Sequence, residues 1–167
     1  MAHKDTITDW AAWPLNREVV VTRVVDADRE TVFNAWADPD QIVLWFGPAG
    51  LEIETHEIDI RTGGLWRFDM VGADGTRFAN RMQFIRIEAP WLIEAHHGSD
   101  TDDDPDRFRL LVTFDAQDNG KTVVTLRQLH PTAARRGFVV GFGAVEYGGQ
   151  TLDKLARHAE GVAAAAR

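Results

Sequence analysis

Five polar side chains have the types and the spacing that acid–base catalysis or ligand binding would need: Glu94, His96, Gln128, His130 and Tyr147. Glu94 and His96 alternate along one predicted strand, and Gln128 and His130 alternate along another. Side chains two positions apart in a strand share a face of the sheet. We therefore expect each pair to lie on the inner side of the fold, together with Tyr147.

This placement requires Leu92 and Leu126 to point inward as well. A histidine beside a carboxylate can act as a general base, because its pKa lies near physiological pH. The alternative is a histidine exposed to water at a sheet edge, or one satisfied by a backbone carbonyl. No catalytic pair emerges from the spacing, so we name no catalytic residue.

Metal sites are not expected from the remaining clusters. Neighbours in a strand point to opposite faces, so His96-His97 cannot give two ligands to one ion. Aspartates alternate from Asp100 to Asp104 as in a calcium loop, but Pro105 stands where such a loop needs glycine. We interpret this segment as a solvated acidic hairpin loop.

Other catalytic and cofactor classes are excluded by missing motifs. The only serine, Ser99, has no nucleophile elbow around it, and the Gly-Phe-Gly run at 141–143 does not open a βαβ unit. The chain has no cysteine, which excludes disulfides, thiolate metal sites and cysteine nucleophiles. We expect no cofactor and a reducing, cytoplasmic location.

Length and composition fit one globular domain. The chain has 167 residues, of which 44% are hydrophobic and 26% charged. Its net charge is −8, and no basic stripe is present to attract nucleic acid. The first residues lack the apolar run of a secretion signal, and the apolar window at 137–145 is too short to span a bilayer, so we expect no membrane insertion.

Three helical segments follow from apolar spacing. Asp28 can cap a short helix that ends near Asp38, where Pro39 begins a second short helix. Gly47 and Pro48 stop that second helix. From about Glu146 onward a helical period returns, which predicts one long closing helix.

The rest of the chain reads as antiparallel sheet. A β-branched run predicts a first strand at 17–25, and turn residues separate six further strands at 51–60, 65–71, 77–87, 91–98, 107–115 and 122–130. The apolar parity changes midway in two of these strands, as one extra residue in a ladder would cause. We predict β-bulges near Thr55 and near Phe84.

The order of these elements predicts an α+β domain with a curved antiparallel sheet of about seven strands around a long C-terminal helix. We place one domain at 17–167 and a separate N-terminal extension at 1–16. Trp10 and Trp13 of that extension lie three residues apart and suit one face of a short helix. They motivate the hypothesis of a homodimer.

The sequence resembles the AHSA-type family, named after the activator of the ninety-kilodalton heat-shock protein ATPase, within the START-like (SRPBCC) superfamily. The resemblance covers nearly the whole domain. It rests on the segment at 59–70 with its Gly63-Gly64 turn, the run at 32–36, Asp38-Pro39, Trp45-Phe46, Gly72 to Gly75, Ala89-Pro90, 120–122, and Gly148 before Leu152 and Leu155. The sequence departs from the family in three places. Gly149 stands where relatives often have tryptophan, Met82 and Arg86 stand where they often have glycine and glutamate, and the N-terminal segment is not part of the usual pattern.

The resemblance implies a helix-grip fold with an internal cavity between the sheet and the closing helix. Such a site is mainly apolar, with a few polar groups that orient the ligand. Its predicted lining residues are Trp45, Phe46, Trp66, Phe68, Met70, Met82, Phe84, Glu94, His96, Leu110, Val112, Gln128, His130 and Tyr147.

Three functions are compatible with this interpretation. We favour binding of a small hydrophobic or amphipathic molecule in the cavity. A co-chaperone role is suggested by the family name and is given less weight, because the chain lacks the additional N-terminal domain of the eukaryotic activator. An enzyme such as a cyclase, dehydratase or hydrolase remains the third alternative, since one fold hosts many chemistries.

Overall fold

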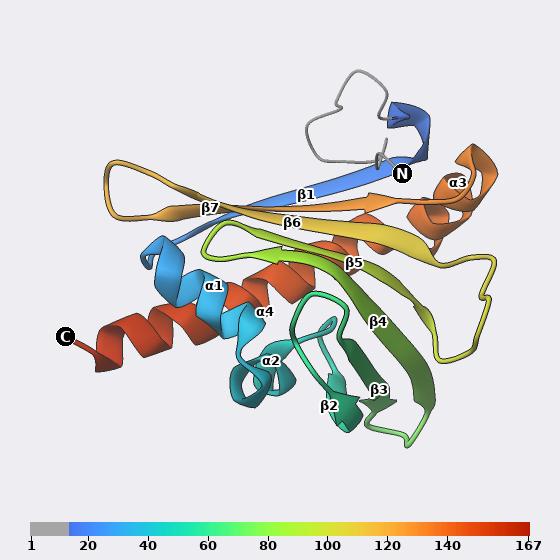
Figure 1. Ribbon diagram of the computed structural model, residues 1–167, viewed down its shortest axis with the longest axis horizontal. Coiled ribbons are helices and arrows are strands. Elements are labelled where there is room, and N and C mark those ends of the chain that lie inside the picture. The colour runs from blue at the N-terminus through green and yellow to red at the C-terminus, as the bar shows by residue number, and fades with distance from the viewer. Residues whose placement is uncertain (1–13) are drawn as a thin grey trace.

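The structure, a computed structural model, describes residues 14–167. An antiparallel sheet with the strand order β1-β7-β6-β5-β4-β3-β2 bends around the long helix α4 (Figure 1). This arrangement confirms the predicted α+β helix-grip architecture. The elements are η2 (Leu15–Arg17), β1 (Glu18–Val25), α1 (Arg29–Ala37), α2 (Pro39–Trp45), β2 (Leu51–Ile58), β3 (Leu65–Gly72), β4 (Arg77–Glu88), β5 (Leu92–Ser99), β6 (Phe108–Ala116), β7 (Thr122–Leu129), α3 (Ala133–Phe142) and α4 (Ala144–Ala165).

Side-chain caps fix the starts of the two short helices. The Asp28 carboxylate accepts a hydrogen bond of 2.8 Å from the Thr31 amide at the start of α1. The Asp38 carboxylate accepts one of 2.9 Å from the Asp40 amide, and Pro39 occupies the first position of α2. Both caps satisfy amides that have no partner within the helix, so the two starts lie where the sequence predicts them.

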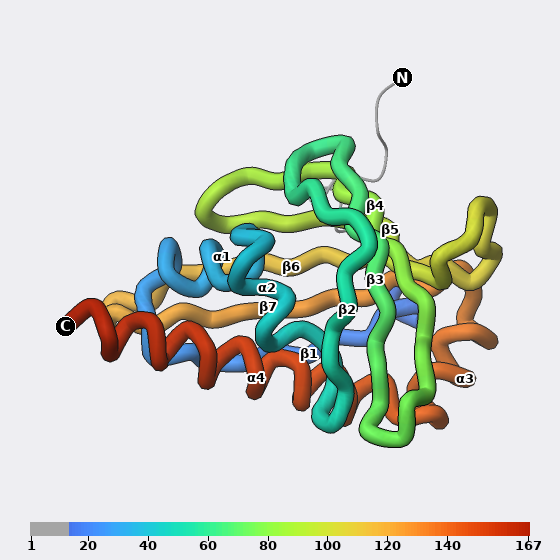
Figure 2. Tube along the Cα trace, turned by 90° about the horizontal axis from the view of Figure 1, so that it is seen from below, coloured from blue at the N-terminus to red at the C-terminus, as the bar shows by residue number. Residues whose placement is uncertain are grey.

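Both predicted β-bulges are confirmed. The register of β2 against β3 shifts between Thr55 and Glu57, and that of β4 against β5 shifts between Phe84 and Arg86. Bulges bend a strand and increase its twist. Figure 2 shows the result, with β2, β3 and β4 running across the direction of β1, β6 and β7.

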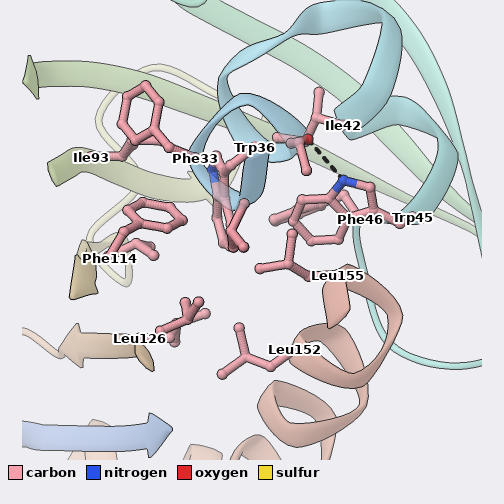
Figure 3. Packing of buried hydrophobic residues seen from close by; sticks show 14 of the residues in the cluster. Phe33, Trp36, Ile42, Trp45, Phe46, Ile93, Phe114, Leu126, Leu152 and Leu155 are labelled. Atoms are coloured by element: carbon pink, nitrogen blue, oxygen red, sulfur yellow. Dashed lines mark hydrogen bonds between the residues drawn. The ribbon is translucent and has the colours of Figure 1, made fainter. Parts of the chain in front are cut away.

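Aromatic rings fill the end of the concave face that lies under α1 and α2 (Figure 3). Trp36 is fully buried and packs edge-on against Trp45 and Phe46, at centroid distances of 5.0 Å and 5.7 Å. The indole Nε1 of Trp45 donates a hydrogen bond of 2.9 Å to the carbonyl of Ala35. This end of the fold is therefore packed core.

The C-terminal part of the chain forms two helices, whereas the sequence predicts a single closing helix that begins near Glu146. The chain forms α3 first, turns at Gly143 with φ of 114°, and then forms α4. No residue of α3 is buried, and Gly137 and Gly141 interrupt its pattern. A local signal for its start was nevertheless present, because the Thr132 side chain accepts a hydrogen bond of 3.0 Å from the Arg135 amide as an N-cap.

The N-terminal extension lies largely outside the described residues. Trp10 and Trp13, on which the homodimer hypothesis depends, fall in that part of the chain. Over residues 14–167, no helix is both long enough and apolar enough to cross a membrane.

Candidate functional site

A hollow of about 140 Å³ lies between the concave face of the sheet and the first turns of α4. Its floor is apolar and comes from three strands, with Met70 on β3, Leu110 on β6 and Leu126 on β7. Phe46, which follows α2, closes the side next to the aromatic core.

Small side chains on α4 leave this space open. Ala144, Gly148 and Thr151 line the hollow, and their spacing of four and three residues places them on one face of the helix. One turn further along, Leu152 and Leu155 are fully buried and fill the core. The hollow therefore exists where the core-facing side of α4 carries no large apolar residue.

A second hollow of about 310 Å³ adjoins the first. The two share His97, Phe108, Gln128, Ala144 and Tyr147 as lining residues. The second hollow also has polar walls and is bordered by α3. Its further polar lining comes from Asn80, Ser99, Asp104, Asp106, His130 and Arg135. Together the two hollows form one site with an apolar inner part and a polar outer part.

His97 lies where the two parts meet. Its Nε2 atom is 3.0 Å from the Asn80 amide oxygen, and its ring packs near Phe46, Phe68 and Phe108 at centroid distances of 6.3, 6.0 and 5.0 Å. Burial among these rings lowers the pKa of His97 to about 4. The imidazole is therefore neutral at pH 7.

His130 lies in the polar part and is almost fully buried, with 1% of its surface exposed. Its Nε2 atom is 3.0 Å from the Gln128 amide oxygen, and its ring packs against Phe108 at 5.0 Å. Burial, followed by the positive charges of Arg135 and Arg136, lowers the pKa of His130 to about 4. This second imidazole is also neutral at pH 7.

The structure divides the predicted lining residues into three groups. Phe46, Met70, Leu110, Gln128, His130 and Tyr147 line the two hollows. A second group packs in the core and comprises Trp45, Trp66, Phe68, Met82, Phe84 and Val112. A third group, Glu94 and His96, lies on the opposite face of the sheet.

The expectation that Glu94 and His96 share the inner side is wrong. Ile93 and Ala95 belong to the main core on the concave face, so their neighbours in β5 point to the convex face. Leu92 is buried as well, but in a small separate cluster. The prediction took the buried Leu92 as a marker of the inner side, although this sheet buries leucines on both faces.

His97 is a central site residue that sequence reasoning missed. The prediction set it aside as the outward neighbour of His96, whereas β5 presents Ile93, Ala95 and His97 to the inside. The alternation of the apolar residues Ile93 and Ala95 with His97 was the signal that these three side chains share the inner face. Phe108 follows the same logic on β6, where it lies on the same face as Leu110.

The arrangement offers hydrogen bonding and no assembled acid-base pair. Within residues 14–167, both inner histidines bond to amide side chains and neither pairs with a carboxylate. In the same range no three histidine or acidic side chains come together as a metal site would require. Two neutral imidazoles, one where the apolar and polar parts meet and one in the polar part, suit recognition of a ligand's polar group.

The predicted acidic hairpin loop is exposed at 101–103, and arginines hold it to the sheet. The Asp100 carboxylate accepts hydrogen bonds of 2.9 Å from Arg67 Nη2 and 3.0 Å from Arg81 Nε. The hydrogen bond from Arg67 is the main reason that the pKa of Asp100 is lowered, and the one from Arg81 acts in the same direction. Asp104 accepts from the Ser99 amide at 2.9 Å, so this carboxylate stabilises the loop from inside.

Comparison with known proteins agrees with this geometry. Residues 26–160 match the model of the family described as Activator of Hsp90 ATPase homolog 1-like protein. None of the curated proteins compared with the chain matches it.

Several solved structures share the fold. A protein of Arthrobacter aurescens solved by NMR superposes with a TM-score of 0.80 at 21% identity, over 87% of each chain. A crystal structure of a protein from Nitrosomonas europaea gives a TM-score of 0.79 at 18% identity, over 90% of this chain and 99% of that one. The AHSA1 protein of Silicibacter pomeroyi gives a TM-score of 0.65 at 20% identity, over 84% and 95%.

These likenesses establish the START-like helix-grip fold, and the family match covers most of the domain described above. The chain belongs to the family of Activator of Hsp90 ATPase homolog 1-like proteins.

Proposed function

We propose that this protein binds a small apolar or amphipathic molecule in the site between the sheet and α4. The observation that carries the proposal is the two-part hollow, whose apolar inner part of about 140 Å³ leads into a polar part lined by His97 and His130. An apolar body would replace water in the inner part, and a polar end would meet the amide and imidazole groups.

The family and its fold support this proposal without naming a ligand. The core-facing side of α4 accounts for the space, because Ala144, Gly148 and Thr151 leave a gap that Leu152 and Leu155 close further along. Unfilled apolar space costs stability, since the side chains around it lose packing contacts. A gap at this position is consistent with space kept for a ligand.

The test is a titration of the protein with 4-propylanisole, an apolar aromatic probe. NMR monitors the chemical shifts of the backbone amides during the titration. We expect shifts at Leu110, Gln128 and Gly148, which line the inner part. Ala144→Phe should weaken binding at least tenfold because Ala144 lines both hollows. Val145→Phe is the matched control, since Val145 is exposed and should leave the affinity unchanged.

Two results would contradict the proposal. One is the absence of shifts at these amides up to the solubility limit of the probe. The other is equal weakening by both phenylalanine variants. If the probe fails to bind and the protein stimulates the ATPase of a cognate heat-shock chaperone, the activator role that the family name suggests takes its place.

A further inference from the structure

A further hollow, here called the arginine hollow, lies where η2, the start of β6 and the end of β7 meet. Its volume is about 360 Å³. Three arginines line it, Arg17, Arg107 and Arg109, together with His96. No carboxylate of residues 14–167 is among its lining groups, although acidic residues outnumber basic ones by 26 to 18 in the chain.

The register of the sheet places the arginine hollow on the convex face. Arg109 pairs with His96 of β5 and with Leu129 of β7, and directly paired residues of antiparallel strands point to the same face. Leu129 packs against the small convex cluster of Leu92 and Leu111. The sheet therefore separates the arginine hollow from the site proposed above for an apolar molecule.

Two of the three arginines bring positive charge that no carboxylate of the described chain balances. Arg109 forms a buried ion pair with Glu94 at 2.7 Å. Within residues 14–167, neither Arg17 nor Arg107 forms an ion pair. The Nε atom of Arg17 donates a hydrogen bond of 2.6 Å to the His130 carbonyl, which positions the guanidinium without neutralising it. The arginine hollow is therefore suited to an anion.

The acidic loop beside the arginine hollow does not fill it. Arg107 also borders a separate hollow that the aspartates at 102–104 line. The charge of Arg107 acts on Asp104, whose carboxylate accepts hydrogen bonds from two loop amides at 2.9 Å each. None of these aspartates lines the arginine hollow. An anion that enters there meets no carboxylate of the described loop.

We infer that the arginine hollow binds a phosphate monoester, which carries a phosphoryl dianion on an organic body. Arginine suits this group, because its planar guanidinium can donate two parallel hydrogen bonds to phosphoryl oxygens. The unbalanced charges of Arg17 and Arg107 match the two negative charges of the dianion. Pro14, Leu129 and Pro131 give the hollow an apolar wall, on which the organic body can pack.

The test compares phenyl phosphate, inorganic phosphate and benzoate by NMR titration. The pH is about 7.5, where a phosphate monoester is doubly charged, and the ionic strength is held constant to equalise screening. We expect phenyl phosphate to shift the amides of Arg17 and Arg107. It should bind about tenfold more tightly than inorganic phosphate, which lacks the ring, and than benzoate, which carries one charge.

A pair of charge-matched variants locates the binding site. Arg107→Gln should weaken the binding of phenyl phosphate about fivefold or more, and the fold should persist because Arg107 is exposed. Arg157→Gln is the control and should leave the affinity unchanged. Arg157 lies on α4, is also exposed and forms no ion pair within residues 14–167. The affinity of Arg107→Gln for 4-propylanisole should stay native, so the two sites are tested separately.

Three results would overturn the inference. They are an absence of shifts at Arg17 and Arg107, binding of either other probe as tight as that of phenyl phosphate, and equal weakening by the two arginine variants. Residues 1–13 precede Pro14 at the rim and contain Asp5 and Asp9. If phenyl phosphate binds only to the full chain with Asp5→Asn and Asp9→Asn, these aspartates compete for the hollow and the inference also fails.

Discussion

The Nε atom of Arg109 donates a hydrogen bond of 2.7 Å to Oε1 of Glu94, and Nη2 of Arg109 lies at the same distance from that oxygen. Only 8% of Arg109 and 5% of Glu94 are exposed, and both lie on the convex face. Glu94 is thus a buried ionic partner on the side of the sheet away from the hollows. Its role is structural.

Glu94→Ala should destabilise the fold and leave ligand binding unchanged. Removing one partner of a buried ion pair typically costs about 3 kcal/mol, because the remaining charge stays buried. Urea denaturation should show this loss, while the affinity for 4-propylanisole stays at the native value. Asp153→Ala is the control, since Asp153 and Arg23 form an exposed pair that is worth less than about 1 kcal/mol. Equal losses in the two variants would contradict the assignment.

Much of this fold can be predicted from local sequence patterns. Val-rich and alternating runs mark the strands, Asp28 and Asp38 mark the helix starts, and the parity change near Phe84 marks a bulge. Each of these features is decided by residues that are neighbours in sequence. Helix α3 is the exception: Thr132 caps its start, but Gly137 and Gly141 are poor helix formers and obscure it in the sequence.

The site is harder to predict because its walls depend on packing between distant segments. Trp66 and Met70 alternate on the same strand, yet Trp66 belongs to the core while Met70 lines the hollow. Sequence patterns identify the face, and the position of α4 decides which residues of that face remain uncovered. On β5 the pattern even predicts the wrong face, because Leu92 is buried on the convex side.

Two adjacent glycines of α4 should respond differently to alanine. A Cβ atom at Gly149 would meet nothing within 4 Å, so Gly149→Ala should stabilise the fold by up to about 1 kcal/mol through helix propensity. A Cβ atom at Gly148 would lie 3.0 Å from Val21 Cγ2, so the branched Val21 side chain would have to shift by a few tenths of an ångström, which offsets the gain in helix propensity. Thermal unfolding should show a higher Tm for Gly149→Ala than for Gly148→Ala. The reverse order would show that α4 does not approach β1 at Gly148.

The two central tryptophans should differ when each is changed to phenylalanine. Trp45 Nε1 donates to the Ala35 carbonyl, whose usual helical partner four residues later is Pro39, which has no N–H. Trp36 Nε1 has no partner among the described residues. Trp45→Phe should therefore lower the free energy of unfolding by about 1–2 kcal/mol more than Trp36→Phe. Equal losses in chemical denaturation would argue against the hydrogen bond.

Acid should weaken the fold before its carboxylates titrate. The pKa of His97 is about 4 in the folded protein, against 6.5 for an ordinary histidine. The unfolded chain therefore binds more protons between these values, and stability falls as pH drops from about 6.5 toward 4. His130 adds a change of the same sign.

Urea denaturation between about pH 7 and pH 5 isolates this histidine effect, since most carboxylates stay charged in that range. Burial lowers the pKa of His158 as well. The loss of stability with acid should be smaller in His97→Gln than in the native protein, because one of the three contributing histidines is gone. An unchanged slope in the variant would mean that His97 is not buried as a neutral ring.

Gly143 should be the least replaceable residue of the turn between α3 and α4. Its φ of 114° is unfavourable for any residue with a side chain, and a Cβ atom would lie 3.2 Å from Tyr147 Cε2. We expect Gly143→Ala to cost about 1–2 kcal/mol and to weaken binding of 4-propylanisole, since Tyr147 lines both hollows. Gly141→Ala is the matched control, because Gly141 is helical with open space around it and should gain stability. A Gly143→Ala variant as stable as Gly141→Ala would show that α3 joins α4 without this turn.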